Sequence, residues 1–340
     1  MLVNAVLLGS LVYGVIAVVT PDMPAPPVIA DLRPPPTQPP GPTAPRIPTK
    51  RQLLRPSGQH FGVSTLQAPW SRKELDQVAR LAGARPTLLE YFVKWTEEFR
   101  PQAVALCYRQ HALPVLSWEP WAGASRGIDQ PDYALAAIAA GRFDGYITRF
   151  ATGIRRQRWP VVLRFAHEMN GHWYPWSERR SGNRPGDYVR AWRHIHTLFR
   201  QAGATNVIWV WSPNIMRSVP QVSLRALYPG DRYVDWIGMV GYAVGERTAG
   251  QVYDPTLATL RRFTRKPVLI TETGAQPGPN KAVWTSDFFR WLSHHRDVIG
   301  FIWFQRDQAS GGGADWKFSS DPRTLRAFRQ GLARTRLPTW

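Results

Sequence analysis

The stretch PVVLRFAHEMNGHWYPW, residues 160–176, contains the change of character that decides the fold. Its first six residues are apolar apart from Arg164, which is typical of a parallel strand that is covered on both faces. His167, Glu168 and Asn170 follow at once, and then come a glycine and three large aromatic residues. Polar groups placed abruptly at the end of a buried strand indicate that the strand opens into a site there.

The same apolar run recurs along the chain, which gives eight candidate strands in all. Segments with helical periodicity separate them, and the segment 186–203 carries an apolar stripe on one face. Eight βα units in about 290 residues predict a (β/α)8 TIM barrel. The alternative, a doubly wound sheet, should have a glycine-rich phosphate turn after its first strand, and FGVSTLQAPW has none. The other seven runs are residues 60–65, 87–92, 113–118, 206–211, 235–242, 267–272 and 300–305.

Two segments of different composition precede the predicted barrel. Residues 2–19 are almost entirely apolar, which predicts a signal peptide or membrane anchor over residues 1–20, although no Lys or Arg precedes it. Residues 21–50 are dense in proline and predict an extended, disordered linker. The folded domain is therefore expected at 51–340. We expect an exported protein, extracellular or at the cell surface, with possible membrane or cell-wall association through the N-terminal segment.

The net charge of +19 is large, but by itself it does not identify a class of partner. The basic residues are scattered and form no long block or nucleic-acid-binding signature, so we expect no nucleic-acid partner. Arginine-rich codon usage or an acidic polymer substrate would both account for the charge. The single cysteine, Cys107, excludes an intrachain disulfide and makes a thiolate metal site improbable. We expect a monomer with no cofactor.

A zinc site at the fourth run is also disfavoured. His167 and His172 are five residues apart, whereas the zinc-binding helix motif requires four, and Gly171 between them opposes a helix. No metal is therefore expected.

Glutamates follow three of the predicted strands: Glu119, Glu168 and Glu272. In a (β/α)8 barrel the carboxyl ends of all strands meet at one mouth, so residues distant in sequence face each other there. A pair of carboxylates across such a mouth is what glycoside hydrolysis requires, because one protonates the leaving oxygen and the other attacks the anomeric carbon. Aromatic residues nearby suit the apolar faces of sugar rings.

RFAHEMNGHWYPW, together with the later ITETG and FIWF, resembles the pattern of glycoside hydrolase family 26 over residues 58–328. This is a family of retaining (β/α)8 enzymes, mainly endo-β-1,4-mannanases with some β-1,3-1,4-glucanases and β-1,3-xylanases. The resemblance implies that Glu168 is the acid/base and Glu272 the nucleophile. It further implies that His167 holds and tunes Glu168, and that Tyr242 hydrogen-bonds the nucleophile.

The resemblance also implies a set of sugar contacts. Trp173 corresponds to the aromatic beside the point of cleavage, and Trp303 to the floor under the reacting sugar. Trp118 and Trp176 are expected as further substrate-binding residues. For three polar residues the sequence leaves two roles open. Arg164 either donates to the nucleophile or forms a buried ion pair, and Asn170 either binds substrate or shapes the turn. Glu119 either lines a sugar subsite or bonds a neighbouring loop.

These observations predict a retaining endo-acting glycoside hydrolase that cleaves a β-linked polysaccharide by double displacement. β-1,4-Mannan is the leading substrate. Mixed-linkage β-glucan, or an exopolysaccharide of the producing cell, is the alternative. A second alternative is a glycan-binding barrel without catalysis, which would need neither Glu168 nor Glu272.

Overall fold

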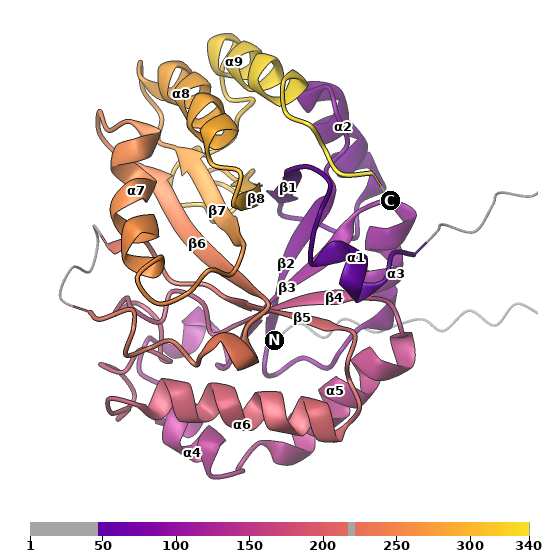
Figure 1. Cartoon of the computed structure of the whole chain (residues 1–340), viewed down its shortest axis with the longest axis vertical. Coiled ribbons are helices and arrows are strands. Elements are labelled where there is room, and N and C mark those ends of the chain that lie inside the picture. Colours follow the sequence, from indigo (N-terminus) through magenta and orange to yellow (C-terminus); the bar gives the residue numbers. More distant parts are fainter. Residues whose placement is uncertain (1–46, 217–221, 340) are drawn as a thin grey trace, which may run out of the picture. The chain divides into compact units, whose positions relative to one another are not determined.

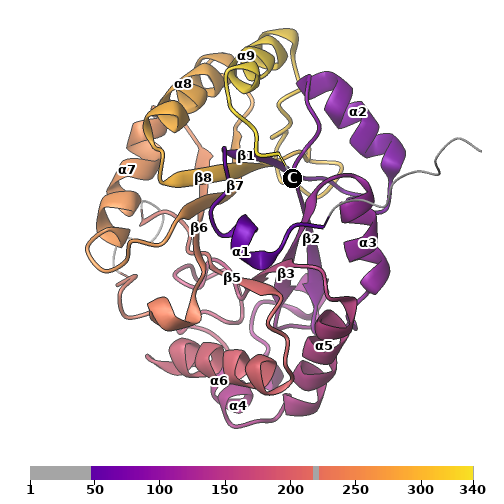
Figure 2. The same ribbon diagram turned by 45° about the vertical axis from the view of Figure 1, so that its right-hand side comes forward.

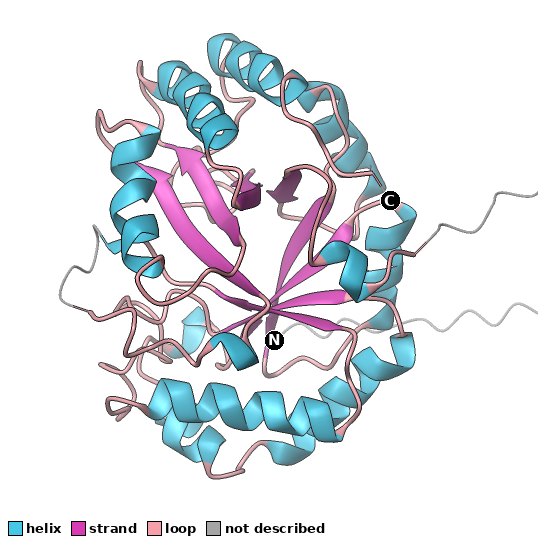
Figure 3. Ribbon diagram, in the orientation of Figure 1, coloured by secondary structure: helices cyan, strands magenta, loops and turns pink. Residues whose placement is uncertain are grey.

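Eight parallel strands close into a barrel in the order of the sequence, so the predicted (β/α)8 architecture is confirmed (Figure 3). The computed structural model describes residues 47–216 and 222–339. Every predicted run coincides with an observed strand to within a few residues. The strands are β1 (His60–Ser64), β2 (Leu88–Lys94), β3 (Leu113–Glu119), β4 (Val161–Phe165), β5 (Val207–Trp211), β6 (Trp236–Ala243), β7 (Val268–Ala275) and β8 (Val298–Phe304).

Helices surround the ring of strands, and Figures 1 and 2 show this outer layer from two sides. The longer helices bury an apolar face, as in α2, where Leu75, Val78 and Ala82 are buried. The predicted helical segment 186–203 is observed as α6, with Gly203 in a left-handed conformation just beyond its end. The α-helices are α1 (Lys50–Leu53), α2 (Arg72–Ala82), α3 (Pro101–Arg109), α4 (Leu135–Ala139), α5 (Asp144–Gln157), α6 (Asp187–Gln201), α7 (Ala249–Leu260), α8 (Lys281–His294) and α9 (Pro322–Ala333).

Strand alternation decides which side chains reach the barrel interior, because successive residues of a strand point to opposite faces. Glu90 of β2, Ser117 of β3 and Arg164 of β4 point inward and hydrogen-bond one another. Trp118, one residue after Ser117, points outward and stacks on Phe150 of α5 at a centroid distance of 4.6 Å. The sheet thus has a polar column inside and an aromatic layer outside.

The described chain contacts the barrel before the predicted start at Arg51. Lys50 Nζ donates to the Val207 carbonyl at 2.6 Å and pairs with Asp235 at 2.8 Å. In Figure 2 α1 lies across the ring of strands. The predicted export segment and most of the predicted linker lie outside the described residues. Within the described ranges, no helix combines the length and apolar character that crossing a membrane requires.

Candidate active site

A buried arginine organises the floor of the barrel mouth. Arg164 NH1 lies 2.6 Å from Glu272 Oε1 and 2.8 Å from Glu90 Oε1, and its Nε donates to Ser212 Oγ at 3.0 Å. Burial alone would lower the pKa of the guanidinium, but the charges of Glu272 and Glu90 raise it. Arg164 therefore forms a buried ion pair, and one of its two partners is the predicted nucleophile.

Glu90, a buried partner of Arg164, is a residue of the site that the sequence did not predict. Burial raises its pKa to about 7 against the opposing effect of Arg164, and Ser117 donates to its Oε1 at 2.7 Å. A glutamate inside an otherwise apolar strand was the available signal, because such a charge requires a buried partner of opposite sign. Arg164, equally isolated within its own strand, is that partner.

The carboxylate of Glu272 is held from two sides within β7, three residues before that strand ends. Arg164 contacts Oε1, and the Tyr242 hydroxyl of β6 donates to Oε2 at 2.7 Å. The hydrogen bond from Tyr242 is directional and the ion pair with Arg164 holds the other oxygen, so the two contacts together orient the carboxylate. The predicted contact between Tyr242 and Glu272 is present in the structure.

Glu168 stands on a strained segment of backbone just after β4. Its φ of +53° and that of Ala166, +44°, lie in the left-handed region, which is costly for residues with a Cβ atom. The Glu168 N–H donates to the Ser212 carbonyl at 2.7 Å, which ties the turn to the end of β5. Strained backbone conformations concentrate at functional sites, so the conformation of Glu168 supports a functional role for this residue.

The Glu168 carboxyl group accepts a hydrogen bond on each oxygen. Asn214 Nδ2 donates to Oε1 and Trp173 Nε1 donates to Oε2, both at 2.6 Å. Burial and the nearby charge of Glu272 raise the pKa of Glu168 to about 7. Near neutral pH a large fraction of Glu168 is thus protonated, as a general acid requires.

The loop that carries Trp173 depends on Gly171. A Cβ atom at Gly171 would lie 2.6 Å from the Trp173 indole, closer than side-chain atoms approach. Glycine therefore permits the indole to fold back over the turn and reach Glu168. This explains why a glycine separates the polar cluster from the aromatic residues.

Replacing Trp173 by Phe should move the alkaline limb of the pH–rate profile upward. The indole hydrogen bond lowers the pKa of Glu168, so its loss raises that pKa and keeps the acid protonated to higher pH. We expect kcat to fall at the optimum because the carboxyl group is less well oriented. The pH dependence of kcat/KM measures the shift. Substitution of exposed His172 by Gln is the control, and an unmoved limb in Trp173→Phe would contradict the assignment of Glu168.

His167 does not contact Glu168 in the way the resemblance implied. Its Nε2 lies 3.2 Å from the Tyr174 hydroxyl and 4.0 Å from Glu119 Oε1, and no hydrogen bond to Glu168 is present among the described residues. Burial and the charge of Arg164 hold the pKa of His167 well below its usual range, so the imidazole is neutral. Trp173 and Asn214, not His167, position the acid.

The hydrogen bonds of Glu119 and Asn170 bear on the two roles that the sequence left open for each residue. Asn170 exchanges two hydrogen bonds of 2.8 Å with the backbone of Asn214, so it shapes the turn. Glu119 accepts from Trp121 Nε1 at 3.0 Å, so it bonds a neighbouring loop, and it also lines the cleft. Burial raises the pKa of Glu119 to about 7.

Three predicted sugar-binding tryptophans are wrong, because Trp118, Trp176 and Trp303 are all fully buried. Trp118 and Trp303 occupy outward-facing positions of β3 and β8, and their indoles pack among the helices. Trp176 lies beneath the loop after β4 and donates to the His167 carbonyl at 2.6 Å. These three tryptophans pack behind the site and support it, and their rings are not exposed to the cleft.

Trp316, in the loop after β8, provides an aromatic face where Trp303 does not. It is half-buried and its ring lies 4.7 Å from that of Tyr242. Trp303 Nε1 donates to the Trp316 carbonyl at 2.8 Å, so the buried tryptophan anchors the partly exposed one. The indole that packs on Tyr242, the hydrogen-bond donor to Glu272, thus comes from the glycine-rich loop GGGADW.

The two kinds of tryptophan should respond differently to substitution. Trp118→Phe should lower the free energy of unfolding by about 1–3 kcal/mol, because it leaves a void and removes the bond to Tyr146, while KM stays within about twofold. Trp316→Ala should raise KM about tenfold with little loss of stability. Urea unfolding and steady-state kinetics distinguish them. A large rise of KM in Trp118→Phe would restore its predicted sugar contact.

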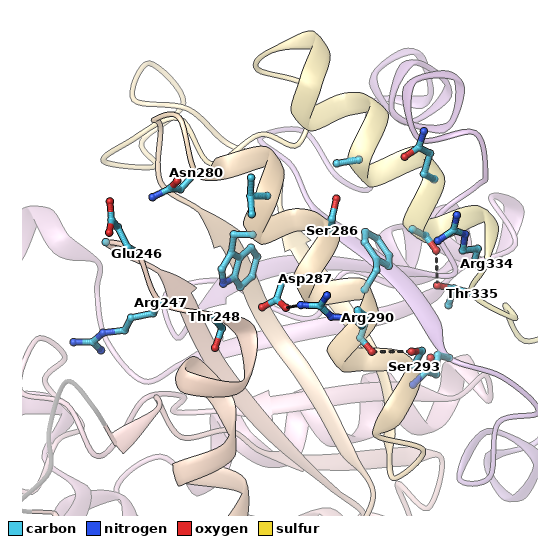
Figure 4. A pocket seen from close by; sticks show the side chains of 18 of the residues that line it. Glu246, Arg247, Thr248, Asn280, Ser286, Asp287, Arg290, Ser293, Arg334 and Thr335 are labelled. Atoms are coloured by element: carbon cyan, nitrogen blue, oxygen red, sulfur yellow. Dashed lines mark hydrogen bonds and ion pairs between the residues drawn. The ribbon is translucent and has the colours of Figure 1, made fainter.

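A cleft of about 590 Å³ opens at the mouth and includes Glu272, Glu119 and Tyr174 in its wall. A larger cavity of about 1000 Å³ lies on the outer surface along α8 and α9 (Figure 4). There Asp287 is bonded to Arg290, and no pair of facing carboxylates is present among the labelled residues. We therefore assign the active site to the smaller cleft.

A (β/α)8 barrel whose fourth and seventh strands each present a glutamate at the mouth has the architecture of a barrel glycoside hydrolase. The sequence model described as Glycosyl hydrolase family 26 matches residues 125–279. This part of the chain is similar to that family.

Individual proteins show similarity over longer stretches of the chain. The chain is 31% identical over 277 residues to endoglucanase H of Acetivibrio thermocellus, covering 77% of this chain but 29% of that protein. It is 24% identical over 208 residues to the β-1,3-xylanase TXYA of Vibrio sp, covering 54% of this chain and 42% of that one. It thus spans less than half the length of these relatives. The structure of Bacillus subtilis mannanase man26 shares the fold, with a TM-score of 0.59 at 19% identity over 81% of this chain and 86% of that chain.

Proposed function

We propose that this protein is a retaining, endo-acting glycoside hydrolase that cleaves the backbone of a β-linked polysaccharide. The observation that carries the proposal is the contrast between two glutamates at one mouth. Glu168 has a pKa raised to about 7, by burial and by the charge of Glu272, whereas Glu272 is paired with a buried cation. Two carboxyl groups in such different environments divide into a proton donor and a nucleophile.

In the first step Glu272 attacks the anomeric carbon while Glu168 gives its proton to the leaving glycosidic oxygen. Arg164 and Tyr242 orient Glu272 for this attack. Formation of the glycosyl ester removes the negative charge from Glu272. Because that charge helps to raise the pKa of Glu168, its loss lowers that pKa.

In the second step Glu168, now a carboxylate, takes a proton from water as the water attacks the ester. This attack releases the sugar with its original configuration and restores Glu272. The coupling between the two glutamates therefore switches Glu168 from acid to base at the moment when each role is needed.

The backbone sugar is proposed as a β-glucan or a β-mannan. Similarity to endoglucanase H extends over 77% of this chain, which supports a β-glucan. The strand-4 motif resembles a family made up mainly of mannanases, which supports mannan. Loops around the cleft, and not the shared barrel, choose between them.

The test is hydrolysis of mixed-linkage β-glucan, β-mannan and β-1,3-xylan, followed by polarimetry or NMR of the first products. We expect viscosity to fall faster than reducing ends appear, as in endo cleavage, and the β-anomer to form first. Appearance of the α-anomer first would show inversion and overturn the mechanism. Binding of these polymers without any cleavage would favour the glycan-binding barrel.

Export remains a proposal that rests on composition alone. The apolar residues 2–19 and the proline-rich residues 21–50 support an extracellular or surface location in which a spacer holds the barrel away from the membrane. Cell fractionation with N-terminal analysis of the recovered protein tests it. Recovery of all the protein from the cytosol would contradict the proposal.

A further inference from the structure

The cleft extends from Glu272 across the carboxyl ends of β1, β2 and β8, in a part that we call the basic arm. Its wall includes Phe92, Lys94, Phe304, Arg306 and, farther out, Trp70. None of these residues takes part in the two-carboxylate chemistry described above. What the arm binds is therefore a separate question about the substrate.

Arg306 is held in place by aromatic rings on either side. Its guanidinium carbon lies 5.5 Å from the ring centroid of Phe92 and 5.3 Å from that of Phe304. NH2 donates to the Thr65 carbonyl at 3.1 Å, at the end of β1. The Nε atom is buried and has no hydrogen-bond partner within the described ranges. A guanidinium held in place in this way is suited to a planar anionic group.

Lys94 supplies a second cation to the arm. It ends β2, where strand alternation places it on the same face as Phe92, and it is exposed. In the part of the chain that the structure describes, neither Lys94 nor Arg306 forms an ion pair with a carboxylate within 4.0 Å.

The carboxylates that line the arm already have partners. Glu97 pairs with Arg100 at 3.4 Å, and Glu98 pairs with Arg149 at 3.2 Å. Glu119 accepts a hydrogen bond from Trp121. Neither cation of the arm forms an ion pair with these groups, although the charge of Lys94 opposes the rise in the pKa of Glu119.

An exposed aromatic residue lies in the outer part of the arm. Trp70 is 48% exposed, although large aromatic side chains are usually covered, and Arg100 lies over its ring at 5.8 Å. Its free ring surface offers a plane for the apolar face of a sugar. The arm thus combines a sugar-binding surface with unpaired positive charge.

We propose that the basic arm binds an acidic sugar of the substrate chain, with the carboxylate of a uronate or of a carboxylated substituent bound by Lys94 and Arg306. The inference rests on the proposed function and specifies its substrate as an acidic β-glycan. The net charge of +19 would further attract such a polymer to the protein.

The experiment compares one polymer in three forms: neutral mixed-linkage β-glucan, the same glucan partly oxidised at C6 to carboxylate, and the oxidised glucan reduced back to the alcohol. We expect kcat/KM to be about tenfold higher for the oxidised form than for either other form, as a charge-assisted hydrogen bond allows. Raising ionic strength from about 0.01 M to about 0.15 M should reduce this preference, since the screening length falls from about 30 Å to about 8 Å.

Variants separate the arm from the overall charge of the protein. Lys94→Gln and Arg306→Gln should each lower the ratio of acidic to neutral kcat/KM, by up to about tenfold. Arg85→Gln removes the same charge from an ion pair with Asp76 outside the cleft, and should leave the ratio unchanged. Equal falls in all three variants, or a wild-type ratio near one, would overturn the inference while hydrolysis itself upholds the proposed function.

Binding gives a readout that does not require turnover. The Glu168→Gln variant is run through gels that each contain one of the three polymers, and the oxidised glucan should retard it most. In the double variant Glu168→Gln/Lys94→Gln, the three polymers should retard the protein equally. Hydrolysis of none of the polymers would refute the proposed function, whereas equal retardation by all three forms would refute acidic recognition by the arm.

Discussion

The Glu272→Ala variant is expected to lose about 10⁴-fold or more in kcat, because no covalent intermediate can form without the nucleophile. Glu272 is the carboxylate of β7 that Arg164 and Tyr242 hold. Release of reducing ends from the best polymer substrate measures the loss. Circular dichroism should show the wild-type fold, although Arg164 is left with one carboxylate partner fewer.

Added azide distinguishes the nucleophile from the acid. In Glu272→Ala, azide can enter on the face that Glu272 occupied and form the α-glycosyl azide from an activated β-glycoside. In Glu168→Ala, azide attacks the intact glycosyl ester from the opposite face and forms the β-glycosyl azide. Exchanged products would reverse the two assignments, and near-wild-type turnover in either variant would refute the site.

The Glu168→Gln variant is expected to lose about 10²–10⁴-fold in kcat on polysaccharide, because the leaving oxygen receives no proton. The loss should be much smaller for an aryl glycoside whose leaving group needs no protonation. Wild-type activity should fall as pH rises through about 7, the value to which burial and the charge of Glu272 raise the pKa of Glu168. This alkaline limb should be absent from the variant.

A carboxylate at the other end of the barrel provides the matched control. Asp297 precedes β8 and pairs with Arg261 at 2.5 Å, so Asp297→Asn should keep the wild-type pH profile and kcat. An alkaline limb that persists unchanged in Glu168→Gln would mean that another group is the acid. Glu119, whose pKa burial also raises to about 7, would then be the next candidate.

The tryptophan corrections show what strand position alone could have revealed. Trp118 lies between Ser117 and Glu119, and both of these polar side chains point inward. Alternation therefore required Trp118 to point outward, toward the helices. Trp303 precedes Phe304, which lines the cleft, so the same argument excluded it. One inward-pointing neighbour in each strand is therefore enough to show that these tryptophans point outward.

Other features could not be read from local sequence. Trp316 contacts Tyr242 from a loop, and a loop has no sequence periodicity from which its position could be predicted. Its position depends on the hydrogen bond from Trp303 of β8 to the Trp316 carbonyl. The pairing of Arg164 with Glu90 joins residues 74 positions apart. Contacts of this kind exist only after the barrel closes, because closure is what brings the ends of β2, β4 and β7 together.

The sequence by itself determined the alternation of eight strands with helices, and it placed Glu168 and Glu272 at strand ends. These are local properties, because apolar runs and their polar ends are set by neighbouring residues. Only the tertiary structure decided which groups hold each glutamate, why Glu168 retains its proton, and which aromatic rings face the cleft. Those properties depend on burial and on charges contributed by other strands, and both arise from packing of the whole barrel.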